Sequence, residues 1–597
     1  MVQEIGPYYD VIIMGGGPAG STLAAQLART SDLQVAVFDK AKFPREHIGE
    51  SLAHPTTPAL EEIGALGKMM DSEFRVQKFG GIFNWDSSQG PSVGFFDHDS
   101  YLADGVHRWA AHVNRAEFDD MLFKHAGDSG AHMFEETTVS AFDRVEDGCV
   151  VTLNDGRTVR CGYFVDASGR RNSIASKKKR DYLSGYKNIA IWQHYLNAEH
   201  TTAVDADWNI FHEGSRSPIT CSAFSDGWCW YIPVPKVIDG ERVMTHSVGI
   251  VTIPAILKEE GKDFTDLEVF SRTIKTVPLI GDLVRDATPI SDKMLTATNY
   301  SMINEEFVDF DNRWILIGDA AYFVDPLFSS GVAFAMHHGL SAATLLKATF
   351  DKDIEEQHKR DLWRDYDQEW HGIAEAFSLS IDQWYHAIGK GNPDSIYWKT
   401  RGQDTGGDIR EQTFQILLST TMEPDLLRVM TNADGTVADL DADGPYMQAY
   451  QQAAAISLRP DDLISLAPGA RMRPSLGLDI PGFKGFAPPA PFEIPAEERE
   501  AIARYWADPI KNGDAIVSPL SQAIPCHRFS VEGATDGTEV RSIEEIDGGS
   551  AVWKCLQSGP TRYAELEQLL NEVQLHLLRL LARAGVVQVE RQPAQVG

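Results

Sequence analysis

Two short apolar runs near the N-terminus flank a glycine-rich segment and a helical pattern. Residues 9–14 are mostly apolar, and a second run over residues 35–38 ends at Asp39. Between the two runs, Leu23, Ala24 and Leu27 recur at the spacing of one helix face. Continuous apolar runs of this length are typical of parallel strands that are buried on both faces. The pattern therefore predicts a strand–helix–strand unit.

The turn that leads into this helix carries a phosphate-binding pattern. It fits G-x-G-x-x-G at Gly15, Gly17 and Gly20, with Ala19 inside the motif. The three glycines permit, in order, a tight turn, a close approach of backbone to a pyrophosphate, and close helix–strand packing. The helix N-terminus attracts phosphate, and Asp39 stands at the distance from the glycines where an acid accepts a hydrogen bond from a ribose. The turn therefore predicts a dinucleotide site.

Two later apolar strands also end at a carboxylate. Residues 163–169 carry Asp166, and residues 314–321 carry Gly318 and Asp319. Carboxylates accept hydrogen bonds from sugar hydroxyls, which favours further contacts with the same nucleotide. The alternative for either aspartate is a helix cap without a ligand.

The second half of the chain has a different pattern. Residues 353–389 predict a helix whose aromatic residues favour core packing over a substrate wall: Trp363, Tyr366, Trp370, Phe377, Trp384 and Tyr385. Residues 466–499 hold seven prolines, which predicts a linker or an extended arm. Residues 500–597 predict a small α+β domain, similar to a winged helix, with a leucine-rich helix over 565–584 and a strand over 585–589.

Composition excludes several classes of partner. The 54 basic and 86 acidic residues give a net charge of −32, which disfavours nucleic acid or an anionic membrane as a partner. No apolar run is long enough for a transmembrane helix, and the first residues lack the features of a signal peptide, which predicts a cytoplasmic protein. The six cysteines show no C-x-x-C pair, so we expect reduced thiols and no metal site.

Three segments resemble, in chain order, those of the FAD-binding family that includes aromatic hydroxylases, geranylgeranyl reductases and flavin-dependent halogenases. They are residues 112–119, 163–169 and 314–321. The resemblance implies that Arg115 lies beside the flavin, that Asp166 belongs to a second dinucleotide motif, and that Asp319 binds the ribityl chain. The further contacts with FAD that we predict are Glu50, Ser51, Gly318 and Gly331.

Two short motifs resemble those of flavin-dependent halogenases, and this resemblance spans about residues 9–400. Residues 228–233 match W-x-W-x-I-P, and residues 78–85 resemble the segment with the catalytic lysine. The resemblance implies that reduced FAD, dioxygen and chloride or bromide yield hypohalous acid. Trp228 and Trp230 would then separate the substrate from the flavin, on a strand that also carries Ile232 and Pro233. Lys78 would meet the hypohalous acid as a hydrogen-bonding ammonium or as an amine that forms a haloamine, and burial favours the amine.

The segment from Phe323 to Val332 resembles the halogenase loop that binds halide through backbone N–H groups, here those of Ser330 and Gly331. Tryptophan halogenases carry a glutamate where this chain has Phe328. Its replacement predicts a substrate that activates itself, such as a phenol or a pyrrole, either free or held on a carrier protein. Some relatives attach FAD covalently through an aspartate, and Asn299 best matches that position, so we predict noncovalent FAD.

The sequence thus predicts an α/β FAD-binding domain, Rossmann-like and of the aromatic-hydroxylase type, with an inserted antiparallel β-sheet substrate domain. This core covers residues 1–350, and a helical region (351–465), the proline-rich linker (466–499) and the C-terminal domain (500–597) follow it. The expected function is halogenation in secondary metabolism, with a separate flavin reductase as partner because a second glycine-rich cradle for NADH is not evident. The alternatives are an FAD-dependent hydroxylase, monooxygenase or reductase, and a non-catalytic FAD-binding protein.

Overall fold

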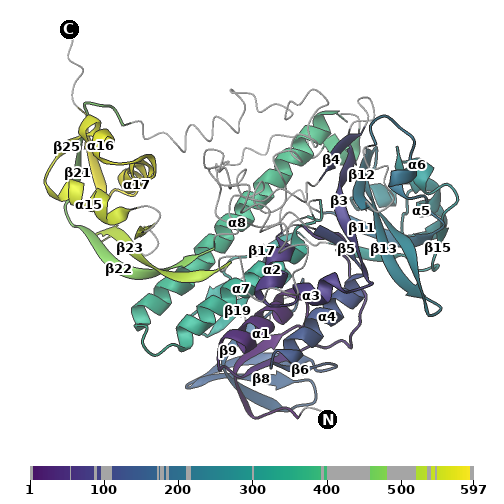
Figure 1. Ribbon diagram of the computed structural model, residues 1–597, viewed down its shortest axis with the longest axis horizontal. Helices are drawn as coiled ribbons and strands as arrows, with labels where there is room; N and C mark the ends of the chain where they lie inside the picture. Colours follow the sequence, from purple (N-terminus) through teal and green to yellow (C-terminus); the bar gives the residue numbers. More distant parts are fainter. Residues whose placement is uncertain are drawn as a thin grey trace, which may run out of the picture. The chain divides into compact units, whose positions relative to one another are not determined.

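A computed structural model of the chain describes residues 4–53, 55–85, 91–95, 110–170, 174, 180–182, 187–209, 217–298, 301–323, 325–327, 329–391, 395–399, 458–480, 520–533, 539–544 and 548–591. The chain divides into two compact units. Unit 1 comprises Met1–Ala343, Glu369–Gly444 and Pro481–Leu520, and unit 2 comprises Thr344–Gln368, Pro445–Ile480 and Ser521–Gly597. The two longest helices, α7 (Gly331–Phe350) and α8 (Glu356–Gly391), each contribute residues to both units (Figure 1).

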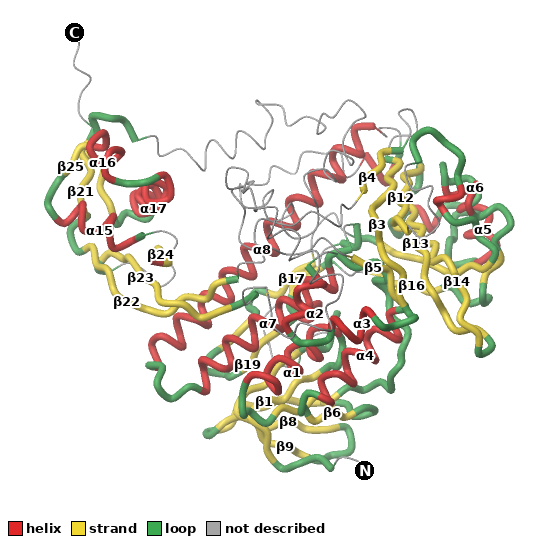
Figure 2. The backbone as a smooth tube through the Cα atoms, in the orientation of Figure 1, coloured by secondary structure: helices red, strands yellow, loops and turns green. Residues whose placement is uncertain are grey.

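The predicted strand–helix–strand unit lies at the centre of an eight-stranded sheet in unit 1, ordered β18-β19-β9-β1-β2-β6, with β8 attached to β9 and β7 attached to β8. The strands are β1 (Tyr8–Met14), β2 (Val35–Phe38), β6 (His132–Phe134), β7 (Val139–Val145), β8 (Gly148–Leu153), β9 (Thr158–Asp166), β18 (Val308–Asp309) and β19 (Trp314–Leu316). Helices α1 (Pro18–Thr30) and α4 (Arg115–Asp128) pack together beside it (Figure 2). The five strands from β19 to β6 run parallel, so their carboxyl ends share one edge.

A nine-stranded sheet forms the second layer of unit 1, ordered β15-β11-β14-β13-β12-β3-β4, with β16 on β11 and β5 on β3. Its strands are β3 (Arg75–Asn84), β4 (Ser92–Phe95), β5 (Ala110–Val113), β11 (Ile189–Leu196), β12 (Ser217–Phe224), β13 (Gly227–Ile238), β14 (Glu241–Thr252), β15 (Thr288–Pro289) and β16 (Leu295–Thr298). The prediction of an antiparallel sheet is wrong in one respect, because β12 pairs with β3 in parallel. The chain builds much of the first sheet between these two strands, and so long a crossover permits parallel pairing.

The described part of unit 1 also contains smaller elements. They are α2 (Thr56–Glu62), α3 (Leu66–Met70), α5 (Leu267–Ile274), α6 (Ile280–Leu283), α9 (Ile396–Lys399), a sheet of β10 (Arg180–Tyr182), β17 (Met302–Asn304) and β20 (Tyr322–Phe323), and three 3₁₀ turns, η1 (Thr201–Ala203), η2 (Ile256–Lys258) and η3 (Gly318–Ala320). The aromatic residues predicted as core on α8 are at most 2% exposed: Trp363, Tyr366, Trp370, Phe377 and Tyr385. The side chain of Trp384 lies outside the described part of the chain.

Besides parts of α7 and α8, the described residues of unit 2 form two small sheets and three short helices. One sheet is β22 (Ala470–Asp479), β23 (Gln522–Val531) and β24 (Val540–Ile543), and the other is β25 (Thr561–Arg562), β21 (Leu463–Leu466) and β26 (Val587–Glu590). The helices are α15 (Gly549–Gln557), α16 (Tyr563–Leu569) and α17 (Glu572–Arg583). The single helix expected over 565–584 is two helices, because Asn571 starts α17 with a capping box that includes Gln574.

Part of the predicted linker is a strand. Residues 470–479 form β22 and pair antiparallel with β23 along their full length. Pro474 is compatible with this strand because β22 lies at the edge of its sheet, where a missing N–H leaves no neighbour without a partner. Residues 481–499 lie outside the described residues.

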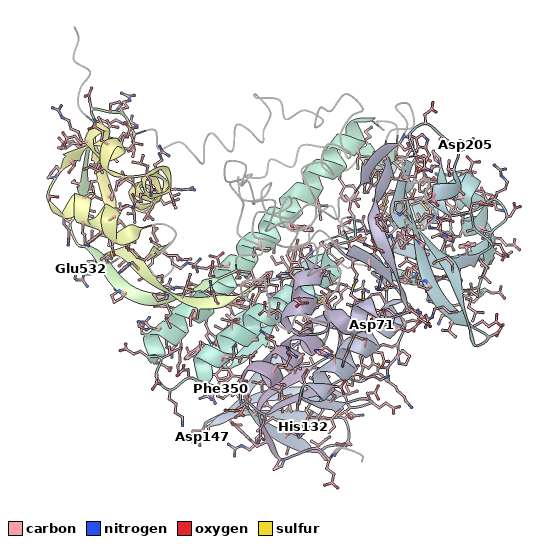
Figure 3. The ribbon with its side chains drawn as sticks, in the orientation of Figure 1. Asp71, His132, Asp147, Asp205, Phe350 and Glu532 are labelled. Carbon is pink, nitrogen blue, oxygen red and sulfur yellow. The ribbon has the colours of Figure 1, made fainter. Side chains whose placement is uncertain are left out.

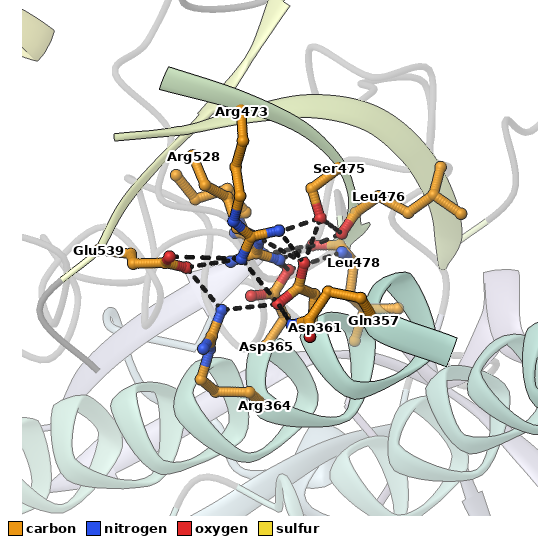
Figure 4. A network of polar contacts seen from close by, with 11 residues as sticks. Gln357, Asp361, Arg364, Asp365, Arg473, Ser475, Leu476, Leu478, Arg528 and Glu539 are labelled. Carbon is orange, nitrogen blue, oxygen red and sulfur yellow. Dashed lines mark hydrogen bonds and ion pairs between the residues drawn. The ribbon is translucent and has the colours of Figure 1, made fainter. Parts of the chain in front are cut away.

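A network of charged side chains joins α8 to the β22-β23-β24 sheet within unit 2 (Figure 4). Asp361 accepts from Arg473 at 2.6 Å, and Asp365 accepts from Arg528 at 2.9 Å and from Arg541 at 2.8 Å. Both aspartates and Arg528 are buried. Burial alone would raise the pKa of Asp361, but hydrogen bonds from Arg473 and Ser475 outweigh it and lower the pKa to about 2.

Candidate active site

The glycine-rich turn lies between β1 and α1, at the carboxyl edge of the parallel sheet. Gly15 has a φ of +112°, and a Cβ there would approach the Ala167 carbonyl oxygen to 2.4 Å. A Cβ at Gly20 would approach the Gly15 carbonyl oxygen to 2.0 Å. The N–H of Gly16 donates to Asp39 Oδ2 at 2.8 Å, so the turn is tied to the end of β2. These contacts leave no room for side chains inside the turn.

The sequence motifs for the nucleotide meet at one cavity in unit 1. Its walls include Gly15, Gly17, Ala19, Asp39, Glu50, Ser51, Arg115, Asp319 and Gly331, all of which were predicted contacts. Two further predicted contacts, Asp166 and Gly318, are not among the residues that line the cavity. Asp166 is buried and accepts from Ser168 N at 3.0 Å, and Gly318 donates its N–H to His338. Burial raises the pKa of Asp319, and the cations Arg170 and Arg115 partly oppose that shift. The cavity lies where α/β sheets bind nucleotides.

Arg115 and Glu50 are held in place by buried partners. Arg115 donates to Asp119 at 3.0 Å and to the carbonyl of Ile48 at 2.6 Å. Glu50 lies 2.6 Å from His194 Nε2, and although burial opposes ionisation, the imidazole outweighs it and lowers the pKa of Glu50. The sequence motifs did not reveal His194, because β11 brings it to Glu50 from 144 residues away.

Cationic side chains that sequence reasoning missed also line the cavity. They are Lys40, Arg45 and Arg170. Arg45 lies beside Gly17, since a Cβ there would be 3.4 Å from its Nη2. Exposed acidic side chains such as Asp71, Asp147, Asp205 and Glu532 carry the opposite charge at the surface (Figure 3). The cavity is thus a local cationic environment in an acidic protein, which suits phosphate.

The cavity wall fits FAD in its polar atoms as well. Ser51 Oγ is buried and has no hydrogen-bond partner among the described residues, and the same is true of Ser168 Oγ. Buried hydroxyls normally have a hydrogen-bond partner, and a ligand in the cavity would supply one for these two. Ser51 and Ser168 both line the cavity, although they are far apart in the sequence. A nucleotide with hydroxyl and carbonyl groups would satisfy both.

The predicted tryptophan wall lines the same cavity. Trp228, Trp230 and Ile232 alternate along β13 and point to the cavity, whereas Pro233 falls on the other face and pairs with His246 of β14. The two indole rings are 6.1 Å apart, and both are buried. Gly249 of β14 lies opposite Trp230, where a Cβ would approach the indole to 2.0 Å. This glycine lets the indole lie flat against the neighbouring strand.

Lys78 is buried on β3, two strands from the wall, and it is not among the residues that line the cavity. Its Nζ donates to the carbonyl of Leu52 at 3.2 Å. Burial lowers the pKa of Lys78 to about 8, and the nearby Cys221 opposes the shift only in part. At pH 7 about one tenth of this side chain is therefore a neutral amine, far more than for a lysine with the ordinary pKa of 10.5.

The predicted halide loop forms a tight turn before α7. Ser329 has a φ of +59° and donates its N–H to the Pro326 carbonyl. The first bond of α7 runs from Phe334 N to Ser330 O, so the N–H groups of Ser330 and Gly331 have no acceptor within the helix. A Cβ at Gly331 would approach the Phe323 ring to 2.9 Å. Asn299 and Phe328, which carried the predictions about FAD attachment and substrate, lie outside the described residues.

Among the described residues, no group of three or more histidine, cysteine or acidic side chains could hold a metal ion. In the same part of the chain, no helix is both long and apolar enough to cross a membrane.

The chain matches a known family over most of its length. Residues 8–378 match the family described as FAD binding domain. A tryptophan 2-halogenase from Chondromyces crocatus is 30% identical over 353 residues, which are 58% of this chain and 62% of the relative. The sulochrin halogenase of Aspergillus terreus is 33% identical over 57% of this chain and 63% of its own length. The chain thus spans less than two thirds of these two relatives.

A third relative matches over more of its length. The 1H-pyrrole-2-carbonyl peptidyl-carrier-protein chlorinase of Pseudomonas fluorescens is 32% identical over 371 residues, which are 58% of this chain and 77% of the relative. Among solved structures, a myxobacterial chondrochloren halogenase is 27% identical with a TM-score of 0.55, over 67% of this chain and 87% of its own. The halogenase CmlS shares the fold over 98% of this chain and 96% of its own, with a TM-score of 0.64 and 22% identity.

Proposed function

Because this chain belongs to the FAD-dependent halogenases, we propose that it makes hypohalous acid from chloride or bromide and transfers the halogen to an electron-rich aromatic ring. When bound, reduced FAD would give two electrons to dioxygen and the halide would give two more, so that one oxygen atom leaves as water and the other becomes part of hypohalous acid. The observation that carries the proposal is the arrangement of one sheet, in which the tryptophan wall faces the nucleotide cavity and the buried Lys78 does not.

We assign FAD to the cavity at the carboxyl edge of the parallel sheet. The glycine-rich turn with Arg45 and Lys40 receives the pyrophosphate, Asp39 a ribose, and Asp319 the ribityl chain. Ser330 and Gly331 offer N–H groups to the halide at the start of α7. We propose that FAD is bound noncovalently, because the side chain at the position of the family's attaching aspartate, Asn299, cannot form the ester.

The tryptophan wall and Lys78 have separate roles in the proposed reaction. Trp228 and Trp230 exclude the aromatic substrate from the cavity, so that the halide is oxidised there instead. The amine of Lys78 then reacts with hypohalous acid to form an N–X bond and release water. The ring attacks the halogen, loses a proton and returns the amine, so the lysine is regenerated. An ammonium at Lys78 would instead donate a hydrogen bond to intact hypohalous acid, and the lowered pKa favours the amine route.

The proposed substrate is a phenol-like or pyrrole-like ring, either free or held on a carrier protein. The phenylalanine at position 328 supports this class, because it removes the glutamate that tryptophan halogenases use. Among the relatives, one is named for pyrrole on a peptidyl carrier, and another is named a tryptophan 2-halogenase. We further propose that a separate flavin reductase supplies reduced FAD.

The test incubates the protein with a flavin reductase, NADH, FAD, bromide or chloride, and a panel of phenols and pyrroles. Products with the isotope pattern of the added halogen, absent when halide is omitted, would support the proposal. Oxygen insertion without halogen would overturn it in favour of a hydroxylase. The same rings loaded on a carrier protein form the second arm, and rapid turnover of the free rings would reject the carrier-bound class.

A further inference from the structure

A chain of buried hydrogen bonds joins the tryptophan wall to the turn before α7. The indole N–H of Trp228 donates to the Tyr385 hydroxyl at 2.9 Å, and that hydroxyl donates to Asp325 Oδ1 at 3.0 Å. Asp325 Oδ1 also accepts from Leu327 N at 3.0 Å, and its Oδ2 accepts from Asn188 at 2.8 Å. All of these contacts lie within unit 1.

The four side chains of this chain of bonds are secluded from solvent. Trp228, Tyr385, Asp325 and Asn188 are each at most 2% exposed. A buried carboxylate is costly unless donors surround it, and here Asp325 receives two N–H groups and one O–H. Tyr385 is the member that touches both ends, since its hydroxyl accepts from the wall and donates to the carboxylate.

The position of Asp325 gives these contacts a consequence for the turn. Pro326, Leu327 and Ser329 follow it directly and line the cavity, and Ser330 and Gly331 come next. The hydrogen bond from Leu327 N fixes the first step of the turn to the carboxylate. The turn closes with the bond from Ser329 N to the Pro326 carbonyl, at a residue with a left-handed φ. A shift of the Asp325 carboxylate would therefore shift the backbone of the turn.

We propose that Tyr385 is a positioning residue that fixes the tryptophan wall and the halide-binding turn in one relative geometry, acting through Asp325. The inference rests on the proposed function for the halide role of the turn, but the physical coupling does not. By donating a hydrogen bond, the Tyr385 hydroxyl also offsets part of the negative charge of Asp325. Without that hydroxyl, the carboxylate is less compensated and a halide at the neighbouring N–H groups binds less tightly.

The first experiment follows amide hydrogen exchange of the full chain. The variant is Tyr385→Phe, which keeps the ring and removes both hydrogen bonds. The Leu327 amide is the reporter, because it donates directly to Asp325. We expect exchange in the 325–331 peptide to accelerate about tenfold, the effect of losing one hydrogen bond to a charged group. Asp325→Asn, which replaces an acceptor oxygen by an amino group, should accelerate the same peptide.

The matched control is Tyr322→Phe. The Tyr322 hydroxyl is also within hydrogen-bond distance of a residue on α8, but that residue is Ser378, at 3.1 Å, which belongs to neither the wall nor the turn. This control should leave exchange of the 325–331 peptide unchanged. Equal exchange in Tyr385→Phe and Tyr322→Phe would overturn the inference, whether or not the protein halogenates.

The second experiment separates positioning from folding by kinetics. In Tyr385→Phe the KM for bromide should rise about tenfold, while the affinity for FAD and the KM for the organic substrate stay within twofold of wild type. A merely structural role would lower kcat or FAD content without moving the bromide KM alone. If wild type fails to halogenate while the exchange result holds, the proposed function is wrong and the coupling stands. An unchanged bromide KM in an active variant would reject the halide part of the inference.

Discussion

At the scale of single residues, Lys78 is the side chain on which the proposed chemistry depends most directly. Replacing it by alanine should lower the halogenation rate by a factor of about 10² or more, because no other group would carry the halogen. FAD binding should survive, since Lys78 does not line the nucleotide cavity. Lys68→Ala, which removes an exposed lysine paired with Asp128, is the control. Product formation and flavin fluorescence measure the two effects, and halogenation at the wild-type rate would refute the role of Lys78.

The same lysine should make the protein less stable than it could be. Burial lowers the pKa of Lys78 to about 8 from its ordinary 10.5, so between these pH values the folded chain holds fewer protons than the unfolded chain. Stability therefore rises with pH through this window, and below pH 8 the buried ammonium costs about 3 kcal/mol. Lys78→Met should raise the melting temperature at pH 7, and the gain should shrink at pH 10. A gain that is equal at both pH values would contradict this account.

Residue identities within motifs were predictable, and their partners were not. The glycines of the first turn and the tryptophans of β13 carry local patterns, and the structure brings them to one cavity. His194 and Tyr385 lie 144 and 157 residues from the side chains that they bind, and no local period connects such pairs. Lys40 and Arg45 follow Asp39 closely and could have been noticed as basic residues beside an expected phosphate site.

At the scale of elements, the packing of the Trp230 ring against β14 should be sensitive to a single added methyl group. In Gly249→Ala the new Cβ would stand 2.0 Å from the Trp230 indole, so the ring must move. We expect halogenation to fall at least tenfold, while FAD affinity stays within twofold. Gly372→Ala on α8 is the control, because its Cβ would meet no atom within 4 Å. Product yield and FAD titration measure the two effects. An unaltered yield in Gly249→Ala would contradict the proposed role of the tryptophan wall.

The elements themselves were predictable where hydrophobic periodicity was strong. The first strand–helix–strand unit and the long aromatic helix follow such periods, and the structure contains both. The prolines of residues 466–499 suggested a linker, yet β22 forms there because an edge strand tolerates Pro474. The leucine stripe of the last helix continued across Asn571, although the chain stops one helix and starts another there. The spacing of the leucines indicates which side chains are buried, whereas the capping residue determines where a helix begins.

At the scale of the whole molecule, the charged network of unit 2 should dominate its stability. Asp361→Asn removes one buried carboxylate that pairs with both Arg473 and Arg528, although Asp365 still pairs with Arg528. Losing one partner of a buried ion pair costs about 3–5 kcal/mol. We expect faster proteolysis within β22–β24. Glu532→Gln is the control, since its pair with Arg471 is exposed and contributes little. Because the pKa of Asp361 is about 2, its contribution should persist above pH 4 and disappear as the pH falls toward 2. Equal cleavage of both variants would refute this role.

The order of the paired residues along the chain determines when unit 2 can fold during synthesis. Asp365 leaves the ribosome 176 residues before Arg541, one of the cations that neutralise it. At ordinary translation rates this gap lasts on the order of tens of seconds. During that time the nascent α8 carries two aspartates whose arginine partners are not all present, and β22, once made, has no strand to pair with until β23 follows it. Unit 2 can therefore close only when translation is nearly complete, and a nascent chain arrested before residue 520 should still be open there.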